Sequence, residues 1–236
     1  MGYADPAVVV GLDCVTGLQT ARILAARGVP VIGVARDPRH YCARTRVCRE
    51  VLAADTTPGE LVGALAALLP RLDGPAVLFP CTDAAVLTLS RHRGALHPHY
   101  RLVLPSAAVV ELLADKLAFW RHAADQGLPI PRTAVLLDRT AAEAVAATFR
   151  FPLVLKPPLT DRRWRAATGE KAYRTATPQE LLATYDRIAG WADRLVAQEW
   201  VAGDTTDLFS CNAYFGEGSR PLATFVARKV RRRGAS

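Results

Sequence analysis

The 236-residue sequence lacks the long apolar runs that a membrane span requires. Its most apolar helical stretch, Leu61 to Pro70, is much shorter than the roughly 20 residues needed to cross a bilayer. The first residues, MGYADP, hold an acid at Asp5 and no basic flank before the apolar run from Ala7, so we expect no secretory signal there. These absences lead us to expect a soluble, cytoplasmic protein.

Cysteine gives no framework of the kind found in secreted or zinc-binding domains. The five cysteines form no CxxC pair, and their odd number argues against both a disulfide scaffold and a zinc ribbon. They stand at Cys14, Cys42, Cys48, Cys81 and Cys211. We therefore expect reduced thiols.

Lysine is scarce, although the formal net charge is +8. Of the 30 basic residues only four are lysine: Lys116, Lys156, Lys171 and Lys229. Lysine offers a compact, flexible ammonium that can reach a phosphate, whereas arginine offers a planar fork. Each remaining lysine is therefore a candidate phosphate ligand.

Much of the positive charge is gathered in a string from Arg228 to Arg233. Such a string could neutralise nucleic-acid phosphates. No interleaved aromatics, recognition helix or RNA motif accompanies it, so we do not expect a nucleic-acid partner.

Hydrophobic patterning predicts an α/β fold for the first hundred residues. Two continuous apolar runs, Ala7 to Leu12 and Pro30 to Ala35, flank a helical pattern from Thr16 to Arg27, which is typical of a βαβ unit in a buried parallel sheet. Further elements follow: helices at Glu60 to Leu69 and Asp83 to Arg91, and strands at Ala76 to Pro80 and Arg101 to Leu104. The turn from Gly11 to Gly17 does not match the GxGxxG dinucleotide fingerprint, which favours a simple tight turn.

After Pro105 the pattern changes to α+β. The sequence predicts helices at Ser106 to Leu113, Lys116 to Gln126 and Pro178 to Ala189, strands at Phe151 to Lys156, Ala172 to Thr175 and Arg194 to Val201, and a loop at Thr160 to Glu170. The segments Leu208 to Phe215 and Pro221 to Val230 predict a hairpin. We divide the chain into residues 1–112, 113–193 and 194–236.

Three motifs recur together in one known superfamily. They are Asp115-Lys116, the strand that ends at Lys156-Pro157, and the stretch Gln198-Glu199-Trp200-Val201-Ala202-Gly203-Asp204. In this order and at these separations the set resembles the ATP-grasp superfamily, and within it the carboxylate-amine ligases. The resemblance covers essentially the whole chain. It implies a Rossmann-like pre-ATP-grasp domain (1–112), a small lobe (113–193), and the hinge strand with the start of a large lobe (194–236).

The resemblance also implies a role for each matching residue. Lys156 and Lys116 would contact the ATP phosphates, while Lys229, with Arg231 beside it, would act at the γ-phosphate. The Gln198 side chain and the backbone of Glu199 and Val201 would bind adenine. Trp200 is counted with the ATP-binding stretch, although an aromatic at such a strand position is more often core than ligand, and Asp204 or Asp207 would meet the ribose. The loop from Thr160 to Glu170 would be a flexible lid. Apart from the resemblance, Asp83 lies at the carboxyl end of a predicted strand and could contact a second substrate.

The implied reaction forms an acyl phosphate from a carboxylate and ATP, which an amine or thiol then captures. The family's Mg²⁺ ligands are expected on strands beyond Ser236, so we expect either a fragment or a truncated gene product. The alternative is a non-catalytic nucleotide-binding or partner-binding module without the metal site. The expected partners are ATP, a small carboxylate and an amine acceptor, and the chain could form a homodimer.

Overall fold

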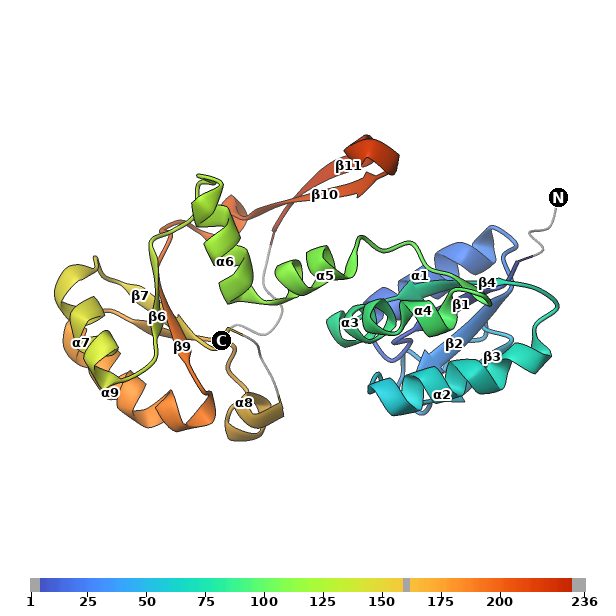
Figure 1. Cartoon of the computed structure of the whole chain (residues 1–236), viewed down its shortest axis with the longest axis horizontal. Coiled ribbons are helices and arrows are strands. Elements are labelled where there is room, and N and C mark those ends of the chain that lie inside the picture. The colour runs from blue at the N-terminus through green and yellow to red at the C-terminus, as the bar shows by residue number, and fades with distance from the viewer. Residues whose placement is uncertain (1–4, 159–161, 231–236) are drawn as a thin grey trace. The chain divides into compact units, whose positions relative to one another are not determined.

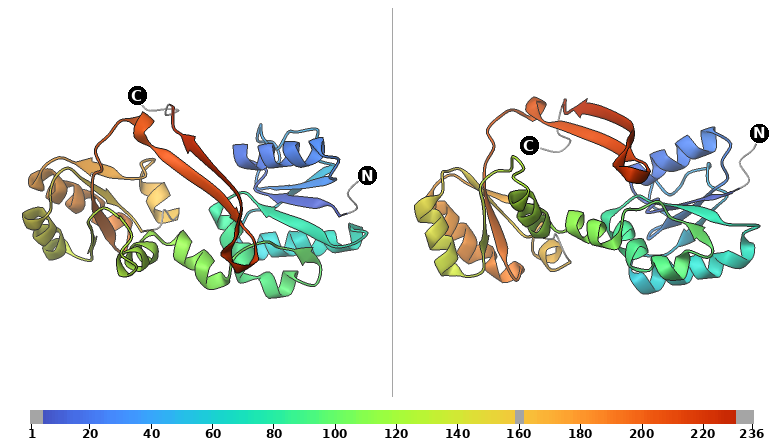
Figure 2. Two further views of the ribbon diagram at one scale, coloured as in Figure 1. Left: turned by 90° about the horizontal axis from the view of Figure 1, so that it is seen from above. Right: turned by 45° about the horizontal axis from the view of Figure 1, so that its top comes forward.

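A computed structural model describes residues 5–158 and 162–230 (Figure 1). The chain divides into two units, Met1–Gln126 and Gly127–Ser236, each of which has its own sheet (Figure 2). Within the described residues no helix has the length and apolar character needed to cross a membrane.

The first unit is built on a five-stranded parallel sheet. Its strands are β1 (Ala7–Val10), β2 (Val31–Ala35), β3 (Glu50–Ala53), β4 (Ala76–Pro80) and β5 (Tyr100–Arg101), in the order β3-β2-β1-β4-β5. The chain order reverses between β1 and β4. In open α/β sheets ligands bind beyond the carboxyl ends of the strands at such a reversal.

Helices cover both faces of this sheet, as the continuous apolar runs predict. Val8 and Val10 of β1 join the core beneath α2 (Pro58–Leu68), whereas Val9 between them joins the core beneath α1 (Val15–Ala26). Helix α3 (Asp83–Arg91) also packs on the α2 side, and the short elements η1 (Leu69–Arg71) and α4 (Arg93–Leu96) follow α2 and α3 in the chain. The predicted α/β architecture is therefore confirmed. The sequence did not predict β3, a half-buried edge strand whose apolar run, Val51 to Ala54, is only four residues long.

The segment from Gly11 to Gly17 forms the predicted tight turn between β1 and α1. Gly11 has φ +88°, and the N–H groups of Gly11 and Leu12 both donate to the Val34 carbonyl at 2.9 Å. The Cys14 thiol caps α1 by accepting from the Gly17 N–H at 3.3 Å. A Cβ at Gly17 would lie 2.3 Å from the Gly11 carbonyl oxygen, so this position admits only glycine.

Helices α5 (Ala107–Ala114) and α6 (Lys116–Asp125) complete the first unit. Both begin where the sequence predicts, because a side chain accepts from the first turn: Ser106 Oγ from the Val109 N–H, and Asp115 Oδ1 from the Leu117 and Ala118 N–H groups.

The second unit holds a four-stranded antiparallel sheet. Its strands β6 (Thr133–Leu136), β7 (Leu153–Lys156), β8 (Tyr173–Thr175) and β9 (Leu195–Glu199) lie in the order β6-β9-β7-β8. Helices α7 (Arg139–Thr148) and α9 (Pro178–Ile188), followed by η2 (Ala189–Trp191), cover one face of this sheet. Leu153 and Leu155 face these helices, so Val154 and Lys156 lie on the opposite face.

The prediction of a loop from Thr160 to Glu170 is wrong for its middle part. Residues Arg162–Ala167 form helix α8, and Trp164 within it is fully buried. The indole Nε1 donates to the Glu170 carbonyl at 2.7 Å, and the ring makes edge contacts with Tyr173 and Trp191. A tryptophan anchored in this way holds the segment against the core, so Arg162–Ala167 is not a flexible lid. Residues 160 and 161 lie outside the described ranges.

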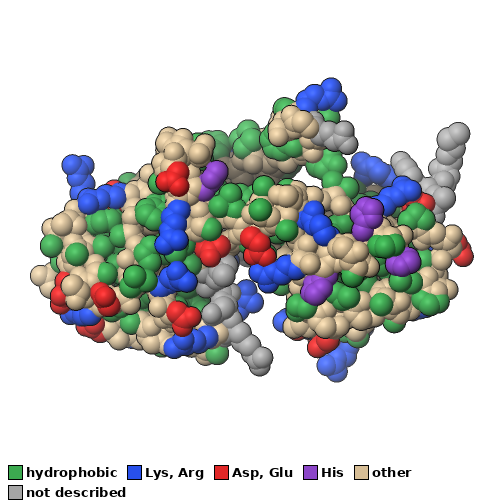
Figure 3. All heavy atoms as spheres, viewed as in Figure 1, with side chains coloured by type: hydrophobic (Ala, Val, Ile, Leu, Met, Phe, Trp, Pro, Cys, Tyr) green, Lys and Arg blue, Asp and Glu red, His purple; other side chains and the backbone are tan. Residues whose placement is uncertain are grey.

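A two-stranded hairpin follows the second sheet. Strands β10 (Phe209–Phe215) and β11 (Pro221–Arg228) pair antiparallel; the single turn η3 (Thr205–Asp207) precedes β10, and η4 (Glu217–Ser219) connects the two strands. This confirms the predicted hairpin. Every residue of the two strands is exposed, Phe209 and Phe225 among them. Figure 3 shows hydrophobic side chains at the surface of the protein.

Candidate functional site

A pocket of about 610 Å³ lies on the face of the second sheet that helices α7 and α9 leave open. Seven of the site residues predicted from the sequence line it: Lys156, Gln198, Glu199, Trp200, Val201, Asp204 and Asp207. The other lining residues are Pro131, Val154, Ala172, Ala202, Gly203 and Leu208. The volume falls within the range of about 300–1,000 Å³ that is usual for small-molecule sites.

Strand alternation explains why Lys156 and Gln198 meet in this pocket. The register pairs Val154 with Gln198 and Lys156 with Val196, so Lys156 and Gln198 are diagonal neighbours on adjacent strands. Leu155 and Ala197 point to the opposite, helix-covered face. Side chains two residues apart share a face, which brings the lysine and the glutamine together above the sheet.

A chain of hydrogen bonds crosses three strands of the sheet. Lys156 Nζ donates to Gln198 Oε1 at 2.7 Å, Gln198 Nε2 donates to Thr133 Oγ1 at 2.9 Å, and Thr133 Oγ1 donates to the Pro131 carbonyl at 2.8 Å. An ammonium group can only donate, so its contact fixes the orientation of the glutamine amide. The chain therefore holds the Lys156 ammonium at the wall of the pocket.

The segment after β9 forms another wall. The Glu199 N–H donates to the Arg132 carbonyl at 2.9 Å and the Trp200 N–H donates to the Pro152 carbonyl at 3.0 Å. Because the Glu199 N–H is used within the sheet, only its carbonyl oxygen can address a ligand. Trp200 is 40% exposed, with the Arg174 guanidinium 5.4 Å from its ring centroid, so it is a surface residue of the pocket and the expectation of a core residue is wrong.

The two candidate ribose ligands close a turn at the rim. The Asp204 N–H donates to Asp207 Oδ2 at 2.8 Å, and the Asp207 N–H donates back to the Asp204 carbonyl at 3.0 Å. Gly203 before them has φ +146°. This turn brings both carboxylates to the pocket wall, where Asp207 already accepts one backbone hydrogen bond.

The remaining predicted cations lie elsewhere. The Lys229 N–H donates to the carbonyl of Leu208, a pocket residue, at 2.8 Å, and the Lys229 residue is exposed. Arg231 lies outside the described residues. Lys116 belongs to the first unit, where it lines a separate pocket together with Asp83.

Sequence reasoning missed Thr133, Pro131 and Arg174. Thr133 contributes through its pairing with Gln198, 65 residues away, and no local pattern encodes that register. The one available signal was a threonine at the start of the short apolar segment Thr133–Leu136.

The described residues contain no group of three His, Cys, Asp or Glu side chains positioned to hold a metal ion.

Comparison with known proteins gives partial matches to ligases. No protein-family model matches the chain. The chain is 24% identical over 149 residues to a D-aspartate ligase from Enterococcus faecium (strain Aus0004), which covers 60% of this chain and 35% of that protein. It is 31% identical over 101 residues to a D-alanine–D-alanine ligase from Ectopseudomonas mendocina (strain ymp), covering 43% and 29%.

The fold matches over nearly the whole chain. A crystal structure of N5-carboxyaminoimidazole synthetase from Staphylococcus aureus complexed with ADP superposes with a TM-score of 0.73 at 15% identity. The match covers 98% of this chain and 56% of the other, so the chain spans about half the length of that relative. The matched region includes both the parallel sheet and the antiparallel sheets. This chain therefore has the fold of the ATP-grasp superfamily.

Proposed function

We propose that the pocket on the open face of the second sheet binds ATP, and that the chain takes part in ATP-dependent carboxylate-amine ligation. The observation that carries the proposal is that seven residues predicted from the sequence line one pocket. Two similarities support it: partial matches to a D-aspartate ligase and a D-alanine–D-alanine ligase, and a fold shared with an ADP-bound enzyme.

The polarity of the pocket suits a nucleotide. Lys156 provides a half-buried ammonium for the phosphates, held in place by Gln198. The Glu199 carbonyl can accept from the exocyclic amine of adenine, and the Val201 N–H can donate to a ring nitrogen. The exposed ring face of Trp200 offers apolar surface to the base. Asp204 and Asp207, at the rim, can accept from the ribose hydroxyls.

In the proposed reaction a substrate carboxylate oxygen attacks the γ-phosphorus and ADP leaves. An amine nitrogen then attacks the carbonyl carbon of the acyl phosphate, inorganic phosphate leaves, and the ammonium formed loses a proton. Positioning and charge neutralisation account for most of the catalysis of phosphoryl transfer. Lys156, with Lys229 of the same unit as a further proposed cation, would supply that neutralisation.

Calorimetric titration of the purified chain with Mg-ATP tests the binding step. Lys156→Ala should lower the affinity about 10-fold or more, since a charge-assisted hydrogen bond contributes about 1.5–3 kcal/mol. Lys171→Ala is the matched control, because Lys171 is exposed in the same unit and does not line the pocket. Equal affinity in the wild type and Lys156→Ala would remove Lys156 from the site.

The chemical step needs a separate assay. The chain, Mg-ATP and a panel of small carboxylates are incubated with hydroxylamine, which converts an acyl phosphate to a hydroxamate. Carboxylate-dependent hydroxamate and phosphate release would support ligation. ATP binding without either product would favour the alternative, a nucleotide-binding module that is not a catalyst on its own.

A further inference from the structure

The first unit contains a second pocket, of about 350 Å³, that the proposed ATP site does not use. Two helices form its walls. Helix α3 contributes Asp83, Val86 and Leu87, and α5 contributes Val110, Leu113 and Ala114. Each set has the spacing i, i+3, i+4, so one continuous face of each helix is turned to the pocket. Leu104, Pro105 and Lys116 complete the lining.

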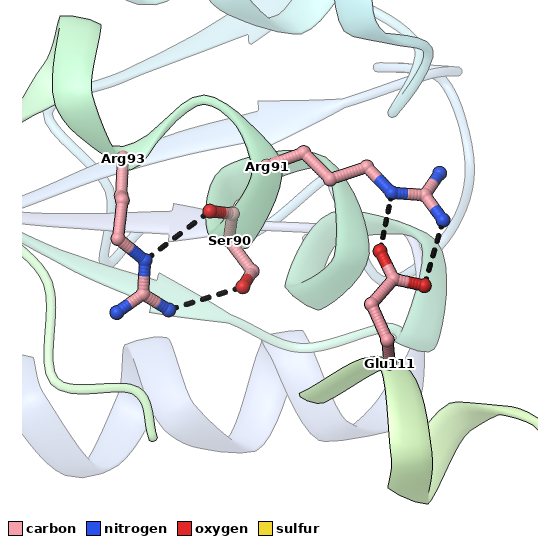
Figure 4. Close-up of polar contacts among 4 residues, drawn as sticks. All are labelled: Ser90, Arg91, Arg93 and Glu111. Carbon is pink, nitrogen blue, oxygen red and sulfur yellow. Dashed lines mark hydrogen bonds and ion pairs between the residues drawn. The ribbon is translucent and has the colours of Figure 1, made fainter. Parts of the chain in front are cut away.

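Arg91 joins the two walls, and Arg93 joins α3 to the segment before α5; Figure 4 shows the Arg91–Glu111 pair and the contacts of Arg93 with Ser90. Arg91 of α3 binds Glu111 of α5 through two hydrogen bonds, Nε to Oε1 at 2.6 Å and Nη2 to Oε2 at 2.9 Å. The hydrogen bonds to Arg91 lower the pKa of the Glu111 carboxyl, so the pair stays ionised at neutral pH. Arg93 donates to the Pro105 carbonyl at 2.6 Å and to Ser90 Oγ at 3.0 Å. Hydrogen bonds therefore join α3 both to α5 and, through Arg93, to Pro105 just before α5.

Asp83 places one end of the pocket near the carboxyl edge of the parallel sheet. Asp83 comes three residues after Pro80, the last residue of β4, and β4 is adjacent to β1, where the strand order reverses. Thr82 caps α3 by accepting from the Ala85 N–H at 3.2 Å, which places Asp83 in the first turn of the helix at the carboxyl edge of the sheet. Ligands of open parallel sheets bind at this edge.

The lining has an apolar floor and one charge of each sign. Leu113, one of the apolar lining residues, is 60% exposed. Asp83 carries the only carboxylate and Lys116 the only ammonium among the nine lining residues. We propose that this pocket binds a small zwitterion with an apolar side chain, the chemistry of an aliphatic amino acid, with Asp83 facing its ammonium and Lys116 its carboxylate. The proposal does not depend on ATP binding in the second unit.

Three small molecules distinguish the contribution of the ligand's ammonium from that of its carboxylate. L-leucine carries both groups, 3-methylbutylamine only the cation, and 4-methylpentanoate only the anion, on nearly the same apolar body. Amide NMR titrations of the full chain should show saturable shifts of α3 and α5 resonances with leucine, and weaker binding of the other two. The absence of saturable shifts with leucine up to about 10 mM would overturn the proposal, since a nine-atom ligand with two ion pairs should bind more tightly than that.

Substitutions then test the lining. Asp83→Asn should weaken leucine and 3-methylbutylamine about 5-fold and leave 4-methylpentanoate unchanged, because an exposed ion pair contributes at most about 1 kcal/mol. Asp73→Asn makes the same change at an exposed site of this unit outside the pocket. Ala114→Phe should abolish binding by filling the cavity, whereas Ala108→Phe, on the outer face of α5, should not. Equal leucine affinity in Ala114→Phe and the wild type would overturn the proposal.

Lys116 distinguishes this proposal from the role that family resemblance gives it. If Lys116 faces the carboxylate of an amino acid, Lys116→Met weakens leucine and 4-methylpentanoate about 5-fold and leaves Mg-ATP affinity unchanged. If it is a phosphate ligand only, Mg-ATP affinity falls and leucine affinity does not, which would remove Lys116 from the zwitterion site. Failure of leucine binding with intact ATP binding would reject the zwitterion site alone.

Discussion

Gln198 accepts a hydrogen bond from Lys156 Nζ at 2.7 Å while its own amide donates to Thr133 Oγ1. Family resemblance gives Gln198 the exocyclic amine of adenine as its partner, yet its acceptor oxygen is already engaged by the lysine. The geometry favours a positioning role: Gln198 holds the ammonium that we propose meets the phosphates, and the Glu199 carbonyl is the acceptor that we propose for the base.

Gln198→Glu tests this coupling. The new carboxylate would pair with Lys156, neutralise its charge and repel phosphate, so Mg-ATP affinity should fall about 10-fold or more while the chain stays folded. Gln198→Leu removes the acceptor but keeps the lysine charge, so its loss should be smaller. Calorimetry measures both, and circular dichroism checks the fold.

Gln179→Glu is the control for that series, because Gln179 is exposed at the start of α9, away from the pocket. It should leave ATP affinity at the wild-type value. A Gln198→Glu variant with wild-type affinity would contradict the positioning role of Gln198.

Trp164 anchors α8 and should be a large contributor to stability. Its side chain is fully buried among Tyr173 and Trp191, and truncation would leave a cavity. Trp164→Ala should lower the free energy of unfolding by about 3–5 kcal/mol, measured by urea denaturation. Trp164→Phe keeps most of the packing but loses the bond to the Glu170 carbonyl, so a smaller loss is expected. Equal stability of Trp164→Ala and the wild type would show that the segment is a loose lid after all.

The sequence predicted most of the fold, because its signals are local. The apolar runs at Ala7 to Leu12 and Pro30 to Ala35 favour buried strands. Ser106 marks the start of a helix through its own side chain. The helix around Trp164 was missed because its polar, charged residues suggested a loop. The contacts that bury Trp164 come from Tyr173 and Trp191, which lie further along the chain.

Only the part of the site that lies in contiguous motifs was predicted from the sequence. Lys156 and the stretch from Gln198 to Asp207 are contiguous motifs, so residue identity alone selects them. Thr133 acts only through strand register with Gln198, which depends on the sheet order β6-β9-β7. Such long-range pairing is set by packing of the whole sheet, and no window of sequence contains it.

Gly17→Ala and Gly63→Ala should change the free energy of unfolding in opposite directions. A Cβ at Gly17 would lie 2.3 Å from the Gly11 carbonyl oxygen, a backbone atom that cannot move without distorting the turn. Gly17→Ala should therefore be strongly destabilising. Gly63, in the interior of α2, has open space around it, so Gly63→Ala should stabilise the chain by about 0.5–1 kcal/mol. Urea denaturation of the two variants beside the wild type measures both effects, and a stabilised Gly17→Ala would contradict the close approach.

Tyr100 should make stability fall at alkaline pH. Burial raises the pKa of its phenol from 10.0 to about 12, and the hydroxyl donates to the Leu65 carbonyl at 2.8 Å. The folded chain thus holds this proton more tightly than the unfolded chain. The stabilising contribution of the protonated phenol to the free energy of unfolding is therefore complete below pH 10 and is lost as the pH rises toward 12. Tyr100→Phe loses the hydrogen bond at every pH, at a cost of about 1 kcal/mol, but removes this titration.

The measurement is the urea midpoint of both proteins from pH 8 to pH 12. Other groups that titrate in this range, such as Cys48, whose pKa burial raises to about 11, are present in both proteins and cancel in the difference. The difference in urea midpoint between the wild type and Tyr100→Phe should therefore become smaller above pH 10, because only the wild type has a buried phenol that can ionise. A gap that stays constant to pH 12 would mean that the phenol ionises equally in the folded and unfolded chains, and that the Leu65 contact does not shield it from water.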